Sequence, residues 1–214
     1  MKLYVAGEEL LLLPQKAAYW PREQTLIVAD IHFGKAASFR ALGVPVPAGT
    51  TSANLLALDE LLALHPVRRI LFLGDFLHAK AAHASSTLAA MLAWRQRHPQ
   101  LLLTLVRGNH DAHAGDPPPQ LDIAMVDEPY VVGPFAFCHH PDVLSAAYVM
   151  AGHVHPVYRL RAGWESLLLP CFLVSPQRLV LPSFGAFTGG HAVLPQPGER
   201  VFVSSGEAVW EIPL

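Results

Sequence analysis

The chain has 214 residues, of which 52% are hydrophobic and 15% are charged, and its formal net charge is −2. This composition supports a large core and argues against long disordered segments, and the length favours a single domain spanning residues 1–214. The small negative charge argues against strong, sequence-independent binding of a polyanion over the whole surface, although a local basic track is compatible with it.

Strand and helix patterns alternate in the first half of the chain. Short apolar segments predict an N-terminal β-ribbon at residues 2–5, 10–13 and 16–20. Three mainly apolar runs are typical of strands buried on both faces, at residues 25–29, 69–73 and 101–106. Helical patterns lie between them, at about 34–42, 51–64 and 85–97. This order predicts βαβ units and a partly parallel sheet.

The second half of the chain has a different pattern, with short apolar segments and no helical periodicity. A stiff loop at residues 115–119, Gly-Asp-Pro-Pro-Pro, separates the two halves. Short strands broken by proline and glycine are predicted beyond it, near 123–126, 130–132, 135–138, 148–151, 157–160, 166–169, 178–181, 200–203 and 208–212. We therefore expect an α/β sandwich of two facing sheets with helices outside.

The cysteines and the apolar runs indicate the compartment. Cys138 and Cys171 are too few for a disulfide framework, so we interpret them as buried free thiols in a reducing compartment. The first nine residues already contain two acids, which is not typical of a signal peptide. No run of 18 or more apolar residues occurs, so no membrane span is expected. These features predict a cytoplasmic protein without a membrane partner.

Metal-binding residue types follow five of the predicted strands directly. These segments are Asp30-Ile31-His32, Gly74-Asp75, Gly108-Asn109-His110-Asp111, His139-His140 and Gly152-His153-Val154-His155. Residues 107–111 alone can be interpreted as a polar turn, because glycine and asparagine tolerate unusual backbone angles. All five segments in order favour one shared site instead, since ligands gather at the carboxyl ends of strands in α/β sheets.

The residue types in these segments point to a metal centre. Carboxylates, imidazoles and an amide oxygen without thiolate form a ligand set for Mn²⁺, Fe or Zn²⁺, and the share of oxygen favours Mn²⁺. The ligands are too numerous for one ion. Two divalent ions bridged by a carboxylate would use them all.

The order Asp-x-His, Gly-Asp, Gly-Asn-His-Asp, His, Gly-His-x-His resembles the calcineurin-like metallophosphoesterase superfamily. The resemblance implies a four-layer α/β sandwich with two mixed β-sheets flanked by helices. It assigns Asp30, His32, Asp75 and His155 to one metal and Asp75, Asn109, His139 and His153 to the other. It also implies that His110 donates a proton or hydrogen bond to the leaving oxygen and that Asp111 orients His110.

Two positions need separate interpretation. The superfamily often has Gly-Asp-x-x-Asp, whereas the last position here is His78, which we interpret as a feature of the subfamily. Either His139 or His140 can serve as the histidine ligand after strand 135–138. The first residue beyond the strand should point at the metals, and side-chain alternation then turns His140 aside, so we favour His139.

A closer resemblance covers nearly the whole chain. The segments "VADIHFGKAASFRALGVPVP", "LGDFLHAK", "RGNHD", "AGHVHPVYRL", "LPCFLV" and "LVLPSFGAFTGG" are similar to the ligase-associated DNA damage response endonucleases. The resemblance implies Mn²⁺-dependent cleavage of DNA phosphodiesters in DNA repair. Single strands should be preferred, because a flexible strand can bend into a cleft at a sheet edge, whereas duplex must deform first. The resemblance also implies functional association with a DNA ligase, an exonuclease and a helicase. That subfamily usually has His-Glu-Pro at residues 139–141, which supports His139 as the ligand.

Candidate substrate contacts and alternative functions complete the expectations. Basic or polar side chains near the motif loops can bind phosphates, namely Lys35, Arg40, His78, Lys80 and Arg107. The first alternative is a small-molecule phosphoesterase acting on cyclic nucleotides or nucleotide-linked precursors, which the net charge of −2 favours. The second is a non-catalytic scaffold, against which the presence of His110 and every ligand argues.

Overall fold

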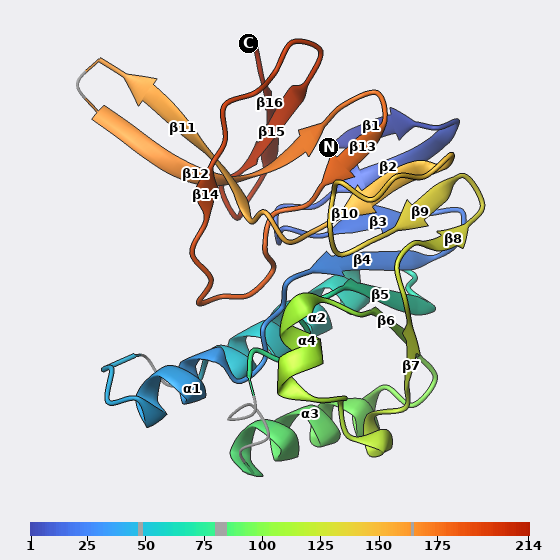
Figure 1. The fold of residues 1–214 in the computed structure, drawn as a ribbon, viewed down its shortest axis with the longest axis vertical. Coiled ribbons are helices and arrows are strands. Elements are labelled where there is room, and N and C mark those ends of the chain that lie inside the picture. Colours follow the sequence, from blue (N-terminus) through green and yellow to red (C-terminus); the bar gives the residue numbers. More distant parts are fainter. Residues whose placement is uncertain (47–48, 80–84, 164) are drawn as a thin grey trace.

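The apolar run at residues 25–29 forms β4 (Thr25–Ala29), a strand buried along its whole length in the first of two β-sheets (Figure 1). The computed structural model describes residues 1–46, 49–79, 85–163 and 165–214. The seven strands of the first sheet lie in chain order. Besides β4 they are β1 (Lys2–Val5), β2 (Glu8–Leu12), β3 (Ala18–Trp20), β5 (Arg69–Leu73), β6 (Leu102–Val106) and β7 (Ile123–Val126).

The first sheet is mixed, and its parallel half carries the helices. Strands β1 to β4 pair antiparallel as a ribbon, whereas β4 to β7 pair parallel. Parallel neighbours need crossover connections, which here contain helices. These are α1 (Lys35–Ala41), α2 (Thr50–Leu64), α3 (Ser85–Arg97) and α4 (Asn109–Ala114), followed by a 3-10 turn, η2 (Pro119–Leu121).

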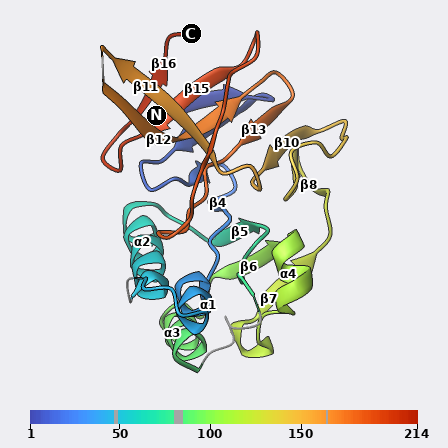
Figure 2. The ribbon, with the colours of Figure 1, turned by 60° about the vertical axis from the view of Figure 1, so that its left-hand side comes forward.

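The second sheet has nine strands and is also mixed. Its main path runs β14-β11-β12-β13-β10-β9-β8, with β15 and β16 added beside β12. The strands are β8 (Tyr130–Val132), β9 (Phe135–Phe137), β10 (Tyr148–Ala151), β11 (Pro156–Ala162), β12 (Glu165–Val174), β13 (Arg178–Val180), β14 (His191–Ala192), β15 (Arg200–Ser204) and β16 (Val209–Ile212). In Figure 2 this sheet lies above the first one, and the helices lie below.

Side-chain alternation along β4 shows how the layers are held together. Leu26 and Val28 belong to a core with side chains of α2 and α3, on the outer face of the first sheet. Ile27 and Ala29 belong to a second core, which they share with Phe137 and other residues of the second sheet. Successive residues of β4 therefore pack into one core or the other, as expected for a strand buried on both faces. Two smaller clusters cover the other face of the second sheet.

The structure differs from the sequence expectations in three places. Residues 109–114 form the short helix α4, which the sequence did not predict because Asn-His-Asp-Ala-His-Ala has weak helix formers and no apolar period. Strands β11 and β12 are longer than expected, because both continue into an exposed hairpin. The short strand β14 and the turn η2 were not predicted, because they have too few residues to show a periodic pattern of apolar side chains. Within the described residues, each helix is too short or too polar to cross a membrane.

Candidate metal centre

The seven expected ligands meet where the loops of the two sheets face each other. The loops after β4, β5 and β6 of the first sheet supply Asp30, His32, Asp75 and Asn109, and those after β9 and β10 of the second sheet supply His139, His153 and His155. Asp30, His32, Asp75 and His139 are buried, His155 is half-buried, and Asn109 and His153 are exposed. The ligand set is therefore shared between both halves of the sandwich, with one side open to solvent.

The first group of ligands consists of Asp30, His32, Asp75 and His155, whose ligand atoms all lie within 4.8 Å of one another. His32 Nε2 lies 3.4 Å from His155 Nε2 and 3.7 Å from Asp75 Oδ2. His155 Nε2 lies 3.5 Å from Asp30 Oδ1. Asp30 Oδ1 is buried without a hydrogen-bond partner among the described residues. A cation would satisfy this oxygen, so the group fits a divalent ion.

The second group gathers around His139 Nε2. This atom lies 2.8 Å from Asn109 Oδ1, 2.9 Å from His153 Nδ1 and 3.6 Å from Asp75 Oδ1. The other ring nitrogen of His139 donates to the carbonyl oxygen of Leu73 at 3.1 Å, so Nε2 keeps its lone pair for a ligand. Burial lowers the pKa of His139 to about 4, so the ring is neutral near neutral pH. Asp75 touches both groups and can bridge two ions.

Glu128 fixes the segment that carries His139. Its Oε2 accepts hydrogen bonds from the backbone N–H groups of His139 and His140, and its Oε1 lies 2.6 Å from Nδ1 of the His140 ring. Burial opposes ionisation of Glu128, but these hydrogen bonds outweigh it and lower its pKa. Sequence reasoning missed Glu128, because no motif marks a carboxylate 11 residues before its partner.

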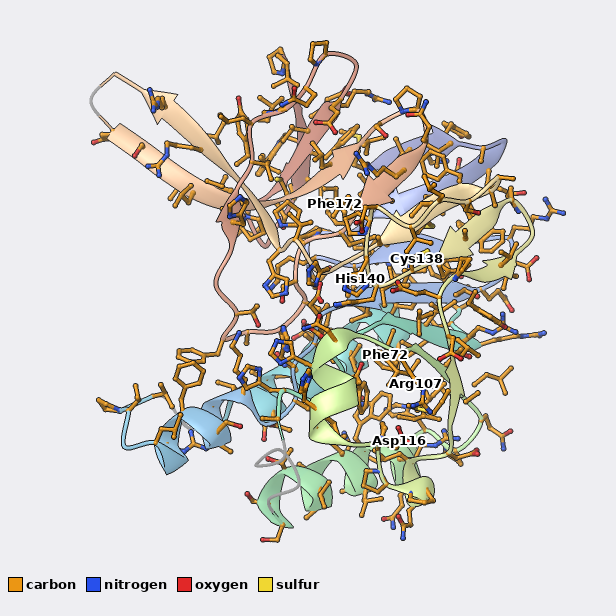
Figure 3. All side chains as sticks on the ribbon, in the orientation of Figure 1. Phe72, Arg107, Asp116, Cys138, His140 and Phe172 are labelled. Atoms are coloured by element: carbon orange, nitrogen blue, oxygen red, sulfur yellow. The ribbon has the colours of Figure 1, made fainter. Side chains whose placement is uncertain are left out.

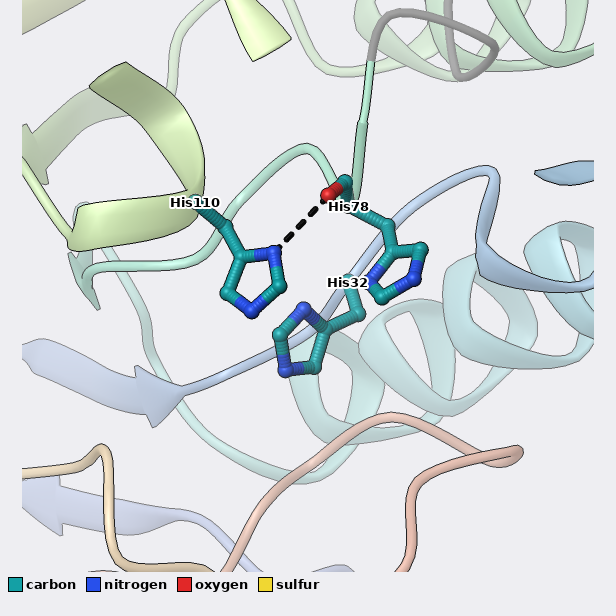
Figure 4. A group of neighbouring side chains, drawn as sticks. All are labelled: His32, His78 and His110. Carbon is teal, nitrogen blue, oxygen red and sulfur yellow. Dashed lines mark hydrogen bonds between the residues drawn. The ribbon is translucent and has the colours of Figure 1, made fainter. Parts of the chain in front are cut away.

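His110 lies beside the shared carboxylate. Its Nδ1–H donates to the carbonyl oxygen of His78 at 2.9 Å, as Figure 4 shows. The bond leaves Nε2 as the nitrogen that can exchange a proton, 3.9 Å from Asp75 Oδ2. The His78 ring also stacks on the His110 ring, with centroids 5.0 Å apart. His78 therefore positions the His110 ring through its backbone and its side chain.

The expected role of Asp111 needs correction, because its carboxylate bonds the backbone and not the His110 ring. It accepts hydrogen bonds from the N–H groups of Phe76, Leu77 and Gly108. Burial raises its pKa to about 6 against these three bonds. Asp111 thus ties the loop after β5 to the start of α4 and positions the His78 carbonyl indirectly.

The backbone at the ligands is strained. Nine residues other than glycine have positive φ among those described, and five of them are Asp30, His32, Asp75, His153 and His155. Such residues each cost on the order of 1–3 kcal/mol and persist only where surrounding contacts enforce them. Asp and His tolerate this region better than most residues. The backbone conformation that turns these side chains toward one point therefore lowers the stability of the folded state.

Two glycines let the strands approach the ligands. A Cβ at Gly108 would lie 2.5 Å from both the backbone N and Oδ1 of Asp75. A Cβ at Gly152 would lie 2.5 Å from Oδ2 of Asp30. Neither contact is possible for real atoms, so these positions require glycine for space.

Comparison with known proteins agrees with this geometry. The model of the calcineurin-like phosphoesterase family matches residues 24–140, which include five of the seven ligands. The chain belongs to the calcineurin-like phosphoesterases. It is also similar to a solved structure of Pseudomonas putida nuclease MPE, with 46% identity, 99% of each chain covered and a TM-score of 0.87. This likeness confirms the α/β class with two mixed sheets flanked by helices.

Other comparisons give weaker likenesses. A protein of unknown function from Aquifex aeolicus is 17% identical, with a TM-score of 0.40 over 61% of this chain and 78% of that one. A Vps29 variant from Entamoeba histolytica is 12% identical, with a TM-score of 0.35 over 88% and 99% of the chains. No curated protein matches the chain. The phosphoesterase is thus a metal-dependent hydrolase of a family that uses a dinuclear divalent metal centre.

The candidate phosphate contacts of this phosphoesterase differ in their placement. Lys35 begins α1 and is half-buried, and burial lowers its pKa although Asp75 and Asp30 act in the opposite direction. Lys35 therefore lies within the field of the ligand carboxylates. Arg40 is exposed on the same helix. Lys80 lies outside the described residues.

Arg107 is directed to other partners. Its Nη1 lies 3.1 Å from Asp116 Oδ1 and its Nε lies 3.9 Å from Asp127 Oδ1. Figure 3 shows Arg107 and Asp116 together near β7 and apart from His140. The structure therefore does not bring this guanidinium to the ligands, although the sequence placed it directly after a buried strand.

Removing each of the two adjacent histidines should have different effects on metal content. We expect His139→Ala to lose the second ion of the phosphoesterase, because His139 Nε2 lies among three other ligand atoms. His140→Ala should retain both ions, because His140 Nδ1 is held by Glu128. Metal content after Mn²⁺ loading and desalting, measured by mass spectrometry, tests this. Retention of both ions by His139→Ala together with loss by His140→Ala would reverse the assignment.

Proposed function

We propose that this phosphoesterase is a two-metal DNA endonuclease that uses Mn²⁺, prefers single strands and acts in DNA repair. The observation that carries the proposal is the position of Asp75, which lies in one group of candidate ligands, 3.6 Å from His139 Nε2 of the other, and beside His110 Nε2. Two divalent ions bound there supply Lewis acidity to phosphoryl oxygens and lower the pKa of water. Such an arrangement suits hydrolysis of a phosphodiester.

The chain's own residues divide the remaining work. His110 holds a proton on Nε2 and delivers it to the leaving oxygen, since Nδ1–H is already engaged by the His78 carbonyl. Asp111 and His78 are positioning residues for that ring. Lys35, at the start of α1, provides a positive charge for a phosphate oxygen.

The ligand chemistry supports Mn²⁺ as the metal. Two carboxylates and one amide provide oxygen, four imidazoles provide nitrogen, and no thiolate is among them. Fe and Zn²⁺ are the alternatives, since imidazole also suits them. Reconstitution with each metal in turn, followed by assay, distinguishes the three.

Similarity supports DNA as the substrate. The solved Pseudomonas putida protein, which covers 99% of this chain at 46% identity, is called a nuclease. The motif resemblance to ligase-associated DNA damage response endonucleases supports a role in repair, in functional association with a DNA ligase, an exonuclease and a helicase. The two cysteines are free and buried, which fits a reducing compartment such as the cytoplasm.

A closed circular single strand of DNA tests the proposal most directly. An exonuclease cannot attack it, because it has no ends. We expect the circle to be linearised and fragmented when Mn²⁺ is present. A closed duplex circle should react more slowly, since duplex must bend sharply to reach metals in a sheet-edge site, at a cost of several kcal/mol. Gel electrophoresis of both circles over time measures the two rates.

Two controls decide what a negative result means. Asp75→Ala should leave the single-stranded circle intact, which excludes a contaminating nuclease. A small aryl phosphodiester and a cyclic nucleotide report on the centre without DNA. If the circle survives while a cyclic nucleotide is hydrolysed rapidly, the protein is a small-molecule phosphoesterase and the endonuclease proposal fails.

A further inference from the structure

The hairpin formed by β11 and β12 begins at the metal centre and projects away from it. Strand β11 starts at Pro156, the residue after the ligand His155. Its residues pair with the first half of β12, from Val157 opposite Pro170 to Ala162 opposite Glu165. Figures 1 and 2 show the hairpin extending beyond the body of the second sheet.

The two faces of the hairpin carry different charges. Arg159 lies opposite Leu168 and Arg161 lies opposite Ser166, so these four residues share a face. The same face continues along β12 to Phe172, which packs in the core between the two sheets. The arginines therefore project on the side of the second sheet that faces the first sheet. Glu165 and the other odd-numbered residues of β12 belong to the opposite face.

The arginines on this face are not neutralised. Both are exposed, and neither forms an ion pair within the described part of the chain. Arg159 donates one hydrogen bond, to Ser166 Oγ at 3.3 Å. Arg107, in contrast, is paired with two aspartates. Leu168, 45% exposed, places an apolar side chain on the same face, opposite Arg159.

We infer that this face, defined by Arg159, Arg161, Ser166 and Leu168, binds the phosphates of a single-stranded nucleic acid as it leaves the metal centre. The inference rests on the proposed function. At about 3.3 Å per strand residue, Arg159 and Arg161 stand roughly 13 and 20 Å from His155. They can therefore contact successive phosphates beyond the one being cleaved. Lys35 and Arg40 lie on α1, which also begins just after a ligand loop.

The test compares a long and a short substrate in the same variants. We expect Arg159→Ala/Arg161→Ala to lower kcat/KM on a single-stranded oligonucleotide of about 20 nucleotides on the order of tenfold. The slope of log kcat/KM against log salt should become shallower by about 1.4, or 0.7 for each lost phosphate contact. kcat/KM on a small aryl phosphodiester should not change, because that substrate does not reach the hairpin.

Two further variants separate charge from structure. Arg68→Ala/Arg69→Ala removes the same charge at the start of β5, the end away from the ligands, and should leave both substrates unaffected. Arg159→Lys/Arg161→Lys keeps the charge and should restore most of the oligonucleotide activity. Equal behaviour of the two alanine pairs on the oligonucleotide, or an equal loss on both substrates for the hairpin pair, would overturn the inference.

The outcome also separates this inference from the proposed function. If the wild-type protein hydrolyses the aryl diester but no oligonucleotide, the nuclease proposal fails and the hairpin surface fails with it. If the wild-type protein cleaves the oligonucleotide and the hairpin variant does so equally well, only the hairpin surface is wrong.

Discussion

Asp75→Ala should bind neither metal ion and should lose on the order of 10³-fold or more in turnover. Asp75 contributes Oδ2 toward His32 and Oδ1 toward His139, so removing it opens both ligand groups at once. The metals account for several kcal/mol of transition-state stabilisation, and each 1.36 kcal/mol is a factor of ten. Metal content after Mn²⁺ loading and kcat on an aryl phosphodiester measure the two effects.

Thermal stability distinguishes loss of metal from damage to the fold. In Mn²⁺ at about 100 times Kd for each of the two sites, the wild-type protein should gain roughly 10–20 °C in Tm, since the ions bind only the folded state. Asp75→Asn keeps an oxygen that can accept the hydrogen bond from the backbone N–H of His110. Its Tm should rise far less than that of the wild type when Mn²⁺ is added. Burial raises the pKa of Asp75, so its ionised form destabilises the metal-free fold above the unfolded pKa.

The stability of Asp75→Asn relative to the wild-type protein, both without metal, can therefore be predicted. Asp75→Asn removes a buried charge and should be at least as stable as the wild-type protein in chelator at neutral pH. Asp116→Ala, which removes an exposed carboxylate, should bind both ions and respond to Mn²⁺ like the wild type. Two bound ions in Asp75→Ala would show that Asp75 does not bridge, and unfolding of metal-free Asp75→Asn would show a structural role.

His110→Ala should keep both ions and lose on the order of 10²–10⁴-fold in turnover on DNA, the usual contribution of a positioned general acid. Nε2 of His110 faces the centre while Nδ1–H is held by the His78 carbonyl, so the ring is oriented for proton delivery. An activated aryl ester, whose leaving oxygen needs little protonation, should lose much less. Turnover of the wild-type protein and of His110→Ala, measured on both DNA and the aryl ester, gives the fold-loss for each substrate.

A neighbouring histidine supplies the matched control. His113 lies one turn later on α4, is exposed and bonds only the Asn109 carbonyl in the described structure, so His113→Ala should retain nearly full activity. Equal losses on DNA and aryl ester for His110→Ala would point to substrate positioning instead of acid catalysis. Loss of metal from His110→Ala would make it a ligand.

The convergence of the candidate ligands could be predicted from sequence, because the segments that carry them follow strands with clear apolar runs. Asp30, Asp75 and His139 leave β4, β5 and β9 at the edge where parallel strands end, so chain position alone gave their convergence. The left-handed backbone angles of Asp30 and Asp75 could not be predicted, since sequence rules favour glycine or asparagine there.

Positions that depend on tertiary partners could not be predicted. Asp111 was expected to orient His110, but its carboxylate reaches three backbone N–H groups that only the folded loop after β5 brings near. Arg107 was expected at the phosphate, but Asp116 and Asp127 lie closer once α4 has formed. Glu128 has no sequence signal, although it holds the backbone of His139 and His140.

The division of the ligands between the two sheets also bears on how the molecule comes apart. Four candidate ligands follow strands of the first sheet and three follow strands of the second. A bound ion would therefore add a link between two layers that also meet through a shared apolar core and through hydrogen bonds, such as those from His139 to Leu73 and from His153 to Asp30. Opening the sandwich would break both ligand groups together. The loaded protein should therefore behave as one cooperative unit, whereas chelation removes the metal link and leaves the apolar core and the hydrogen bonds to hold the two sheets against the strained loops.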